Sequence, residues 1–462
     1  MPLPTIPAAA LAFAAVLATG CAAFDPNNIL TRHFPPPTDS ANSPLPPPAS
    51  SVLGESARRA ALDFVWTTVN ERYFDPKFNG ADWPAARARW EPQALAASDD
   101  ELFWETLDRM TGELHDAHTR VESPARAALI ERSESVSLGF GFRLMDGQLI
   151  VTTVHPESDA FWAGVRPGMA LAEVAGEPAP AAYARWLDTA RDSSTPRSKH
   201  NAAARKLLAG EADTPVVLTF TRGDASSFTS TLKRRRFTSP PRVTHRLLPS
   251  GFGYIRLTNW AQSMQGSMIA AIEALKSAPG LVIDLRGNPG GSAQMVRNVA
   301  ARFFKEEVEI GRALTRTGKP ITIAFDWIEL VKVKQEVDGT GTYLGPVFVL
   351  VDADSASASE LFAGILQSQK RATIVGQTTC GCLLAYMGYA AVPGGGRLAY
   401  SEVDFAFPDG KRIEGIGVVP DVAVVRTAAD LRVDRDRALE EAQAHLATPG
   451  AAGEGEKYRE RR

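Results

Sequence analysis

Short apolar runs alternate with stretches of helical periodicity between residues 240 and 425. The runs are "FGYIRL", "LVIDLR", "PVFVLVD" and "ATIVG", and helices are expected between them near 264–277, 292–304 and 357–369. Strands that are apolar on both faces need cover on both sides, and parallel strands need a crossover, usually a helix, to connect them. The alternation therefore predicts a largely parallel βαβ sheet with helices on both faces.

The length and composition extend this prediction to a multi-domain α/β protein. A chain of 462 residues is long enough for about three domains, and a hydrophobic share of 44% can supply several cores. The net charge is -3 and 22% of the residues are charged, so neither a basic nucleic-acid surface nor an acidic tail is indicated. We expect a soluble globular protein that does not bind nucleic acid.

The N-terminus has the features of an export signal. The apolar run "PAAALAFAAVLATGCAA" is too short for a comfortable membrane span and ends in small residues before Cys21. "ATGC" resembles a bacterial lipobox, which implies cleavage after residues 1–20 and a lipid on Cys21; a plain signal peptide is the alternative. We expect a periplasm-facing lipoprotein of the cell envelope, anchored to the membrane without spanning it. The Pro-rich residues 21–54 are predicted to form a tether.

A helical domain is predicted for residues 55–133. One helical face is shared by Leu62, Val65, Trp66, Val69 and Tyr73. The stretch "SDDE", beginning at Ser98, is typical of a capping box that opens a further helix. That helix ends near "LHDAHT", so His118 is expected on the loop that follows.

Residues 134–238 change to short β-like runs. "LGFGF" and "AGVRPGMAL" resemble the PDZ domains of bacterial proteases, with Leu138, Gly139 and Phe140 in the loop that binds a peptide carboxylate. This resemblance implies that an extended peptide adds to a sheet edge. A small β domain that serves only for packing is the alternative. The segment "YARWLDTARDSSTPRSKHNAAARKLL" is longer than is usual in such domains.

Two loops at predicted strand ends carry the candidate chemistry. The glycines of "DLRGNPGG" (284–291) allow backbone N–H groups to approach a ligand, and "VDADSASASELF" (351–362) leads from a strand into a helix. A serine at a helix N-terminus lies beside unpaired N–H donors, as the nucleophile of an acyl-transfer reaction requires. The same pattern also fits a serine that only caps the helix.

Together with "EGIGVVPDV" (414–422), these loops resemble the carboxyl-terminal processing peptidases and their tricorn-type relatives, serine peptidase family S41. "FVWTTVNERYFDPKFNGADW" and "MTGELHDAHTRV" resemble the segments that precede the core in this family, so the resemblance covers about residues 55–430. It implies a mixed, ClpP/crotonase-like peptidase core at 239–430, followed by a C-terminal helix and disordered tail at 431–462. The implied activity is a serine endopeptidase of the cell envelope that cleaves polypeptides through an acyl-enzyme, with no cofactor and no metal.

The resemblance also assigns roles to individual residues. It makes Ser357 the nucleophile, and the backbone N–H groups of Ala358 and of Gly290 or Gly291 the oxyanion hole. The processing peptidases place a lysine base in a "T-x-G-K" stretch, but the matching "TIVGQTTCGC" has Cys382 in that place. A cysteine is a poor base for a serine.

The tricorn-type relatives use a histidine and a glutamate instead, which match His118 and Glu414. In those relatives a serine beside the histidine mediates the glutamate contact, whereas this chain has Ala117 there; Asp116, Thr119 or a water molecule could replace it. A metal site at His115, Asp116 and His118 is the competing interpretation, but H-D-x-H is not a recognised zinc spacing.

Two further functions compete with the peptidase. The missing lysine is compatible with a catalytically inactive S41-like protein that binds peptides or small ligands in the same cleft. A thiol redox protein would need C-x-x-C at a helix N-terminus, whereas Cys380 and Cys382 are separated by one residue. In a strand these two side chains would point to one face, and we expect no disulfide between them.

Overall fold

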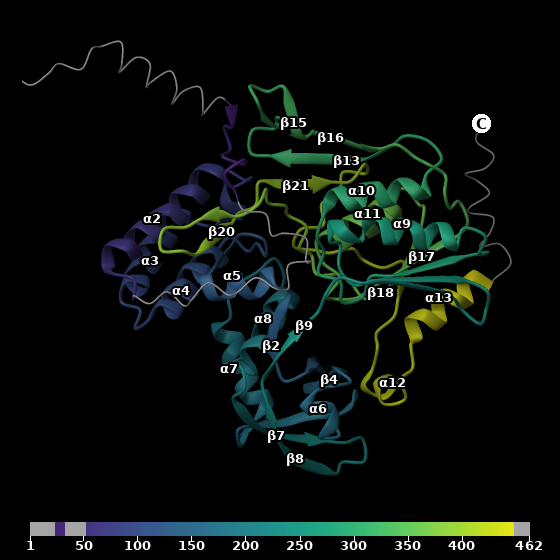
Figure 1. The fold of residues 1–462 in the computed structure, drawn as a ribbon, viewed down its shortest axis with the longest axis horizontal. Coiled ribbons are helices and arrows are strands. Elements are labelled where there is room, and N and C mark those ends of the chain that lie inside the picture. Colours follow the sequence, from purple (N-terminus) through teal and green to yellow (C-terminus); the bar gives the residue numbers. More distant parts are fainter. Residues whose placement is uncertain (1–23, 33–51, 448–462) are drawn as a thin grey trace, which may run out of the picture.

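The computed structural model describes residues 24–32 and 52–447 (Figure 1). The N-terminal helical region contains α2 (Glu55–Arg72), η1 (Phe78–Gly80), α3 (Trp83–Leu95), α4 (Asp100–Gly112) and α5 (Pro124–Glu131). The cap of α4 is Asp99, whose side chain accepts a hydrogen bond from the Leu102 N–H, so the predicted start at Ser98 is one residue early. Among the described residues, no helix is long and apolar enough to cross a membrane.

The N-terminal helices share their core with the C-terminal half of the chain. Tyr73, Trp83 and Phe103 are fully buried there, and Leu398 and Tyr400 complete the same cluster. Strand pairing makes a second connection, because β1 (Arg120–Glu122) lies antiparallel to β20 (Arg397–Ala399), which pairs with β19 (Ala390–Ala391). His118 lies two residues before β1, so this pairing positions it against the rest of the protein.

The middle region, residues 134–238, is an antiparallel β structure with three helices. Its sheet has the order β3-β4-β5-β7-β8, and β6 pairs with β5. β2 and β9 pair separately, where the chain enters and leaves the region. The strands are β2 (Glu134–Ser137), β3 (Phe140–Met145), β4 (Gln148–Val154), β5 (Ala170–Val174), β6 (Glu177–Pro178), β7 (Pro215–Thr221), β8 (Ser227–Lys233) and β9 (Arg235–Thr238). The helices are α6 (Asp159–Trp162), α7 (Ala179–Thr189) and α8 (Pro196–Leu207).

A mixed six-stranded sheet forms the centre of the core region, in the order β10-β11-β12-β17-β18-β22. β10 runs antiparallel to β11 and the other neighbours are parallel, so the mixed, largely parallel core that the sequence predicts is confirmed. The strands are β10 (Val243–Leu247), β11 (Gly253–Leu257), β12 (Leu281–Asp284), β17 (Val347–Val351), β18 (Thr373–Gly376) and β22 (Val422–Ala423).

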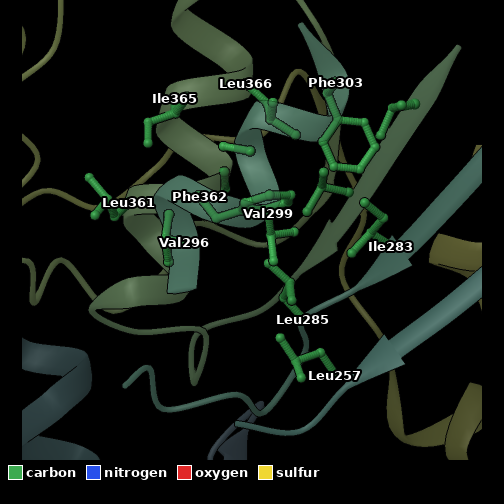
Figure 2. Close-up of a cluster of buried hydrophobic side chains, with 14 of the residues drawn as sticks. Leu257, Ile283, Leu285, Val296, Val299, Phe303, Leu361, Phe362, Ile365 and Leu366 are labelled. Atoms are coloured by element: carbon green, nitrogen blue, oxygen red, sulfur yellow. The ribbon is translucent and has the colours of Figure 1, made fainter. Parts of the chain in front are cut away.

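Helices cover both faces of this sheet. One face carries η2 (Gln262–Met264), α9 (Gln265–Ala274), α10 (Ala293–Ala300), η3 (Ala301–Phe303) and α11 (Ala358–Ser368). Figure 2 shows Val296 and Val299 of α10 close to Phe362 of α11, in the same buried cluster as Ile283 of β12. α13 (Arg437–Ala447) lies against the other face, preceded by α12 (Ala428–Arg432). Every residue of β17 is buried, as expected for a strand covered on both sides.

A smaller sheet and a hairpin extend the core region towards the N-terminal segment (Figure 1). The sheet has the order β16-β13-β21, with β13 (Val308–Thr315), β16 (Lys334–Val337) and β21 (Val403–Ala406). The hairpin consists of β14 (Ile321–Ile323) and β15 (Ile328–Val331), which pair only with each other among the described strands.

Residues 24–32, part of the predicted tether, pack against the core region; Cys21 and residues 33–51 lie outside the described residues. The Asp25 carboxylate accepts hydrogen bonds from the N–H groups of Ile29 and Leu30. The Arg32 guanidinium forms a buried ion pair with Glu402, 2.5 Å between Nη1 and Oε2. We call residues 24–32 the N-terminal strap.

Removing the charge of Arg32 should destabilise the protein, because the Glu402 carboxylate would stay buried without its cation. We expect Arg32→Ala to lower the free energy of unfolding by about 3 kcal/mol in urea denaturation. The double variant Arg32→Met/Glu402→Leu should recover most of that loss. Arg59→Ala, which removes an exposed arginine paired with Glu55, is the control and should have no measurable effect. Equal effects of Arg32→Ala and Arg59→Ala would contradict this assignment.

Candidate active site

His118 and Ser357 are 239 residues apart in sequence and meet at the junction of the N-terminal and core regions. His118 lies between α4 and β1, and Ser357 is the residue that precedes α11. The distance between His118 Nε2 and Ser357 Oγ is 3.1 Å, which is a hydrogen bond. A neutral imidazole at this position can accept the hydroxyl proton.

The backbone of Ser357 has a conformation that is unusual for a side-chain-bearing residue, with φ 55° and ψ -117°. Its N–H donates to the carbonyl oxygen of Cys382 at 3.0 Å and to Glu360 Oε2 at 2.9 Å. Gly290 packs directly against it, since a Cβ added to Gly290 would lie 2.6 Å from the Ser357 Cβ. Neighbouring backbone therefore holds the serine in the position that presents its hydroxyl.

Glu360, in the first turn of α11, is a functional residue that the sequence analysis missed. It is fully buried, and Oε1 accepts hydrogen bonds from the Thr379 hydroxyl at 2.6 Å and the Gly381 N–H at 2.7 Å. Oε2 accepts from the N–H groups of Cys382 and Ser357, each at 2.9 Å. Burial raises the pKa of Glu360, and these four donors oppose the rise. The carboxylate thus connects the serine to the loop 379–382.

Two backbone N–H groups remain for an oxyanion beside Ser357. The Gly290 N–H is already used, because it donates to Asn288 Oδ1 at 3.0 Å. Within the part of the chain that the structure describes, the N–H groups of Ala358 and Gly291 have no acceptor. Of the two predicted glycines, Gly291 is therefore the one with a free donor. Asn288, which the sequence analysis did not single out, holds the loop by donating to the Leu257 carbonyl.

Glu414 lies close to this site but does not contact His118. Its Oε2 accepts hydrogen bonds from the N–H groups of Leu383 at 2.6 Å and Leu384 at 3.1 Å. Glu414 Oε1 and His118 Nδ1 are both buried, and neither has a hydrogen-bond partner among the described residues. Asp116 and Thr119 do not fill this gap. The Asp116 carboxylate accepts from the His118 N–H at 2.7 Å and from the Thr119 hydroxyl, so both hold the loop instead.

Ser194 of the middle region lies beside this gap. Its Oγ accepts a hydrogen bond from the Ala117 N–H at 2.9 Å. Burial raises the pKa of the neighbouring Glu414 carboxylate, and the Ser194 hydroxyl opposes part of that rise. Ser194 thus places a hydroxyl next to Ala117, the position where the tricorn-type relatives are expected to have a serine. The unusual length of this segment is visible in the sequence, but no motif marks the serine.

The residues around Ser194 attach the middle region to the site. Arg191 donates to the carbonyl oxygens of Asp116 and Thr119, which flank His118. The Thr195 hydroxyl donates to the carbonyl of Cys380 at 2.7 Å. The segment 191–197 therefore joins the histidine loop to the loop 379–382.

Comparison with known proteins identifies the family. Two family profiles match: peptidase family S41 at residues 251–424, and the tricorn protease C1 domain at residues 55–112. A chloroplastic C-terminal processing peptidase of Tetradesmus obliquus is 28% identical over 403 residues, which cover 81% of this chain and 78% of that protein. A carboxyl-terminal-processing protease of Synechocystis is 27% identical over 387 residues, which cover 81% of this chain and 82% of that protein. The core region, residues 251–424, belongs to peptidase family S41.

Solved structures share the fold of this S41 peptidase. The photosystem II D1 C-terminal processing protease has a TM-score of 0.53 and 24% identity, and the match covers 86% of this chain and 98% of that chain. Mature CPAF has a TM-score of 0.63 and 16% identity, and the match covers 85% and 97% of the two chains. The predicted family and enzyme class are confirmed: the protein is a serine-type peptidase, and its substrates are polypeptides.

The cysteine pair of this S41 peptidase departs from the prediction. Cys380 and Cys382 form a disulfide, with their Cα atoms 5.3 Å apart, so the expectation of no bond between them is wrong. The segment is not a strand: Gly381 adopts φ 74°, and the turn brings the two side chains together. Cys382 therefore offers no free thiol beside Ser357, and it contributes its backbone carbonyl to the Ser357 N–H.

The loop that resembles a PDZ carboxylate-binding loop lies at a sheet edge. Leu138 is buried in the core of the middle region, and Phe140 begins β3, the edge strand. The Gly139 N–H donates to Ser137 Oγ at 3.2 Å. From the same strand, Arg143 forms an ion pair with Asp354, three residues before the nucleophile candidate. Whether this region is a PDZ domain remains a prediction.

The two predicted histidines are in different environments. His115 is exposed and lines a cavity of about 380 Å³ between the N-terminal and middle regions, with Trp90, Arg109 and Lys199. His118 is half-buried, and burial lowers its pKa, with Asp116 opposing the shift and Arg120 adding to it. Burial raises the pKa of Glu414, and the charge of Asp116 raises it further.

These opposite shifts predict the pH dependence of Ser357 reactivity. His118 stays neutral, and able to accept a proton, at a pH where an ordinary histidine would be charged. Glu414 takes up a proton at a pH where an ordinary glutamate would be ionised. We expect the rate of wild-type labelling by a fluorophosphonate to fall as Glu414 is protonated on acidification from pH 8. The Glu414→Gln variant should be slower at pH 8 and unchanged between pH 7 and pH 5.5. An acid limb near pH 6.5 in that variant would contradict the lowered pKa of His118.

Proposed function

We propose that this S41 peptidase is a serine endopeptidase of the bacterial cell envelope that uses Ser357 as nucleophile and His118 as general base. The observation that carries the proposal is the 3.1 Å contact between His118 Nε2 and Ser357 Oγ, at the N-terminus of α11. The N–H groups of Ala358 and Gly291, in the residues adjoining Ser357 and Gly290, have no acceptor among the described residues, which supports it.

The chemistry follows from these positions. Ser357 Oγ attacks the carbonyl carbon of the scissile peptide bond while His118 Nε2 takes the hydroxyl proton. The N–H groups of Ala358 and Gly291 donate to the negative oxygen of the tetrahedral intermediate. His118 then gives its proton to the leaving amine, which leaves an acyl ester on Ser357. A water molecule, deprotonated by His118, hydrolyses that ester and restores the serine.

Ser194 and Glu414 orient His118 in this proposal. A proton on His118 Nδ1 is donated to Ser194 Oγ, and the Ser194 hydroxyl donates to Glu414 Oε1. The two buried unpaired atoms, His118 Nδ1 and Glu414 Oε1, both gain a partner in this way. A charged imidazolium would be stabilised by the same connection, so the link contributes mainly during proton transfer.

The remaining parts of the proposal concern location and peptide binding. A lipid on Cys21 would hold the peptidase on the periplasmic side of a membrane. The loop Leu138, Gly139 and Phe140, at the open edge of β3, would bind a polypeptide tail as an added strand. The second candidate, an inactive peptide-binding protein, is motivated by Cys382 in the place of the lysine. The contact between His118 and Ser357 favours the enzyme.

A serine-directed fluorophosphonate probe tests the nucleophile and the base. We expect the wild type to be labelled, Ser357→Ala to be unlabelled, and His118→Ala to be labelled at least about 100-fold more slowly. Ser226→Ala, at an exposed turn of the middle region, is the matched control and should be labelled like the wild type. Absence of wild-type labelling at every pH from 6 to 9 would support the inactive alternative instead.

The role of Ser194 is tested by comparing it with its neighbour. Ser194→Ala should lower the labelling rate by about 10- to 100-fold and make it independent of the state of Glu414, because the proposed link is broken. Ser193→Ala, one residue earlier, should keep the wild-type rate and pH profile. A slow Ser194→Ala variant with an unchanged pH profile would mean that Ser194 only supports the Ala117 backbone.

A further inference from the structure

Large apolar side chains at the tip of the β14–β15 hairpin are exposed to solvent. The exposed fraction is 85% for Trp327, 52% for Phe325 and 49% for Ile328. Soluble surfaces seldom place three such residues within four positions, and apolar groups that gather in this way commonly mark an interaction site. Figure 1 shows the hairpin at the periphery, next to the purple N-terminal strap.

The base of this hairpin is firmly packed. Ile321 of β14 belongs to a buried cluster with Ala313 of β13, Val403 of β21 and Ile29 of the strap. Leu330 and Val331 of β15 pack against the same cluster. The exposed tip is therefore attached to a firmly packed base, and its aromatic side chains are not members of that buried cluster.

The strap begins at this tip. The Ala324 N–H donates to the carbonyl oxygen of Phe24 at 2.6 Å, and the rings of Phe24 and Phe325 meet edge to face at 5.7 Å. Phe24 is itself 42% exposed. The ion pair of Arg32 with Glu402 fixes the other end of the strap. Phe24, Phe325, Trp327 and Ile328 thus form one surface, which we call the aromatic tip.

The chain length before the strap determines what the aromatic tip can face. Cys21 precedes Phe24 by three residues, and an extended chain spans at most about 3.6 Å per residue. If Cys21 carries a lipid, the distance from Phe24 to the membrane surface would therefore be at most about 11 Å. Tryptophan and phenylalanine are favoured at the level of lipid headgroups, where an apolar ring meets a wet surface.

We propose that the aromatic tip inserts into the interfacial layer of a lipid bilayer and docks the peptidase on the membrane beside its anchor. The proposal rests on the envelope location proposed above. A lipid on Cys21 would tether the chain without fixing its orientation, so the tip would supply a second contact that orients the peptidase on the membrane. The charges of the hairpin balance, with Lys319 and Lys332 against Asp326 and Glu329, so the contact is apolar rather than electrostatic.

Vesicles of phosphatidylethanolamine and phosphatidylglycerol (7:3) test the docking. With the unacylated Cys21→Ser chain, we expect Trp327→Ser to lower the vesicle partition coefficient about tenfold, with little dependence on salt from 50 to 500 mM. Trp162→Ser is the matched control, because Trp162 is 76% exposed on the middle region and should not affect binding. Bromine-labelled lipids should quench the wild type more than Trp327→Phe.

The outcomes separate this proposal from the enzymatic one. All the variants should keep wild-type labelling of Ser357, so loss of docking does not depend on activity. Equal partition of Trp327→Ser and Trp162→Ser, together with no difference in quenching in the acylated chain, would overturn the proposal. Concentration-dependent self-association that is lost in Trp327→Ser would also overturn it, because a second copy of the chain would then cover the tip. Mass analysis of the N-terminus tests the lipid on Cys21 separately.

Discussion

The site depends on the buried carboxylate of Glu360. A buried negative charge is costly unless hydrogen bonds satisfy it, and here four donors converge on its two oxygens. The donors come from Ser357 and from the loop 379–382. The carboxylate therefore attaches this loop to α11. The same carboxylate that caps α11 thus fixes both the unusual backbone of the serine and the loop that supports it. Losing one donor would leave the charge poorly compensated, so the arrangement forms as a unit.

Around this centre, the residues of the proposed site come from separate parts of the chain. Ser357 belongs to the core region and His118 to the end of the N-terminal helices, while Ser194 comes from the middle region. Their relative positions depend on the pairing of β1 with β20 and on the hydrogen bonds of Arg191 to the histidine loop. The reactive geometry is thus a tertiary property, since no local segment contains two of these three residues.

Sequence patterns predicted the parts of this structure that have local signals. The alternation of apolar strands and helices predicted the sheet, and the family motifs predicted that His118 and Ser357 would meet, as they do. Ser194 and Glu360 were missed because their roles arise from contacts with distant residues. The Cys380–Cys382 disulfide was missed because a strand was assumed where Gly381 makes a turn. The position of the strap was equally hidden, since a Pro-rich segment gives no sign that Arg32 has a buried partner.

The segment 191–197 has a consequence for how such a protein can be divided. In sequence it runs from the end of α7 into the first residues of α8, within the middle region, yet its hydrogen bonds end on the loops that carry His118 and Cys380. The middle region is therefore not a detachable module. A chimera that exchanged the middle region for another domain would also remove the hydrogen bonds that hold the loop carrying His118. Any change to this region is therefore also a change to the surroundings of His118 and Ser357.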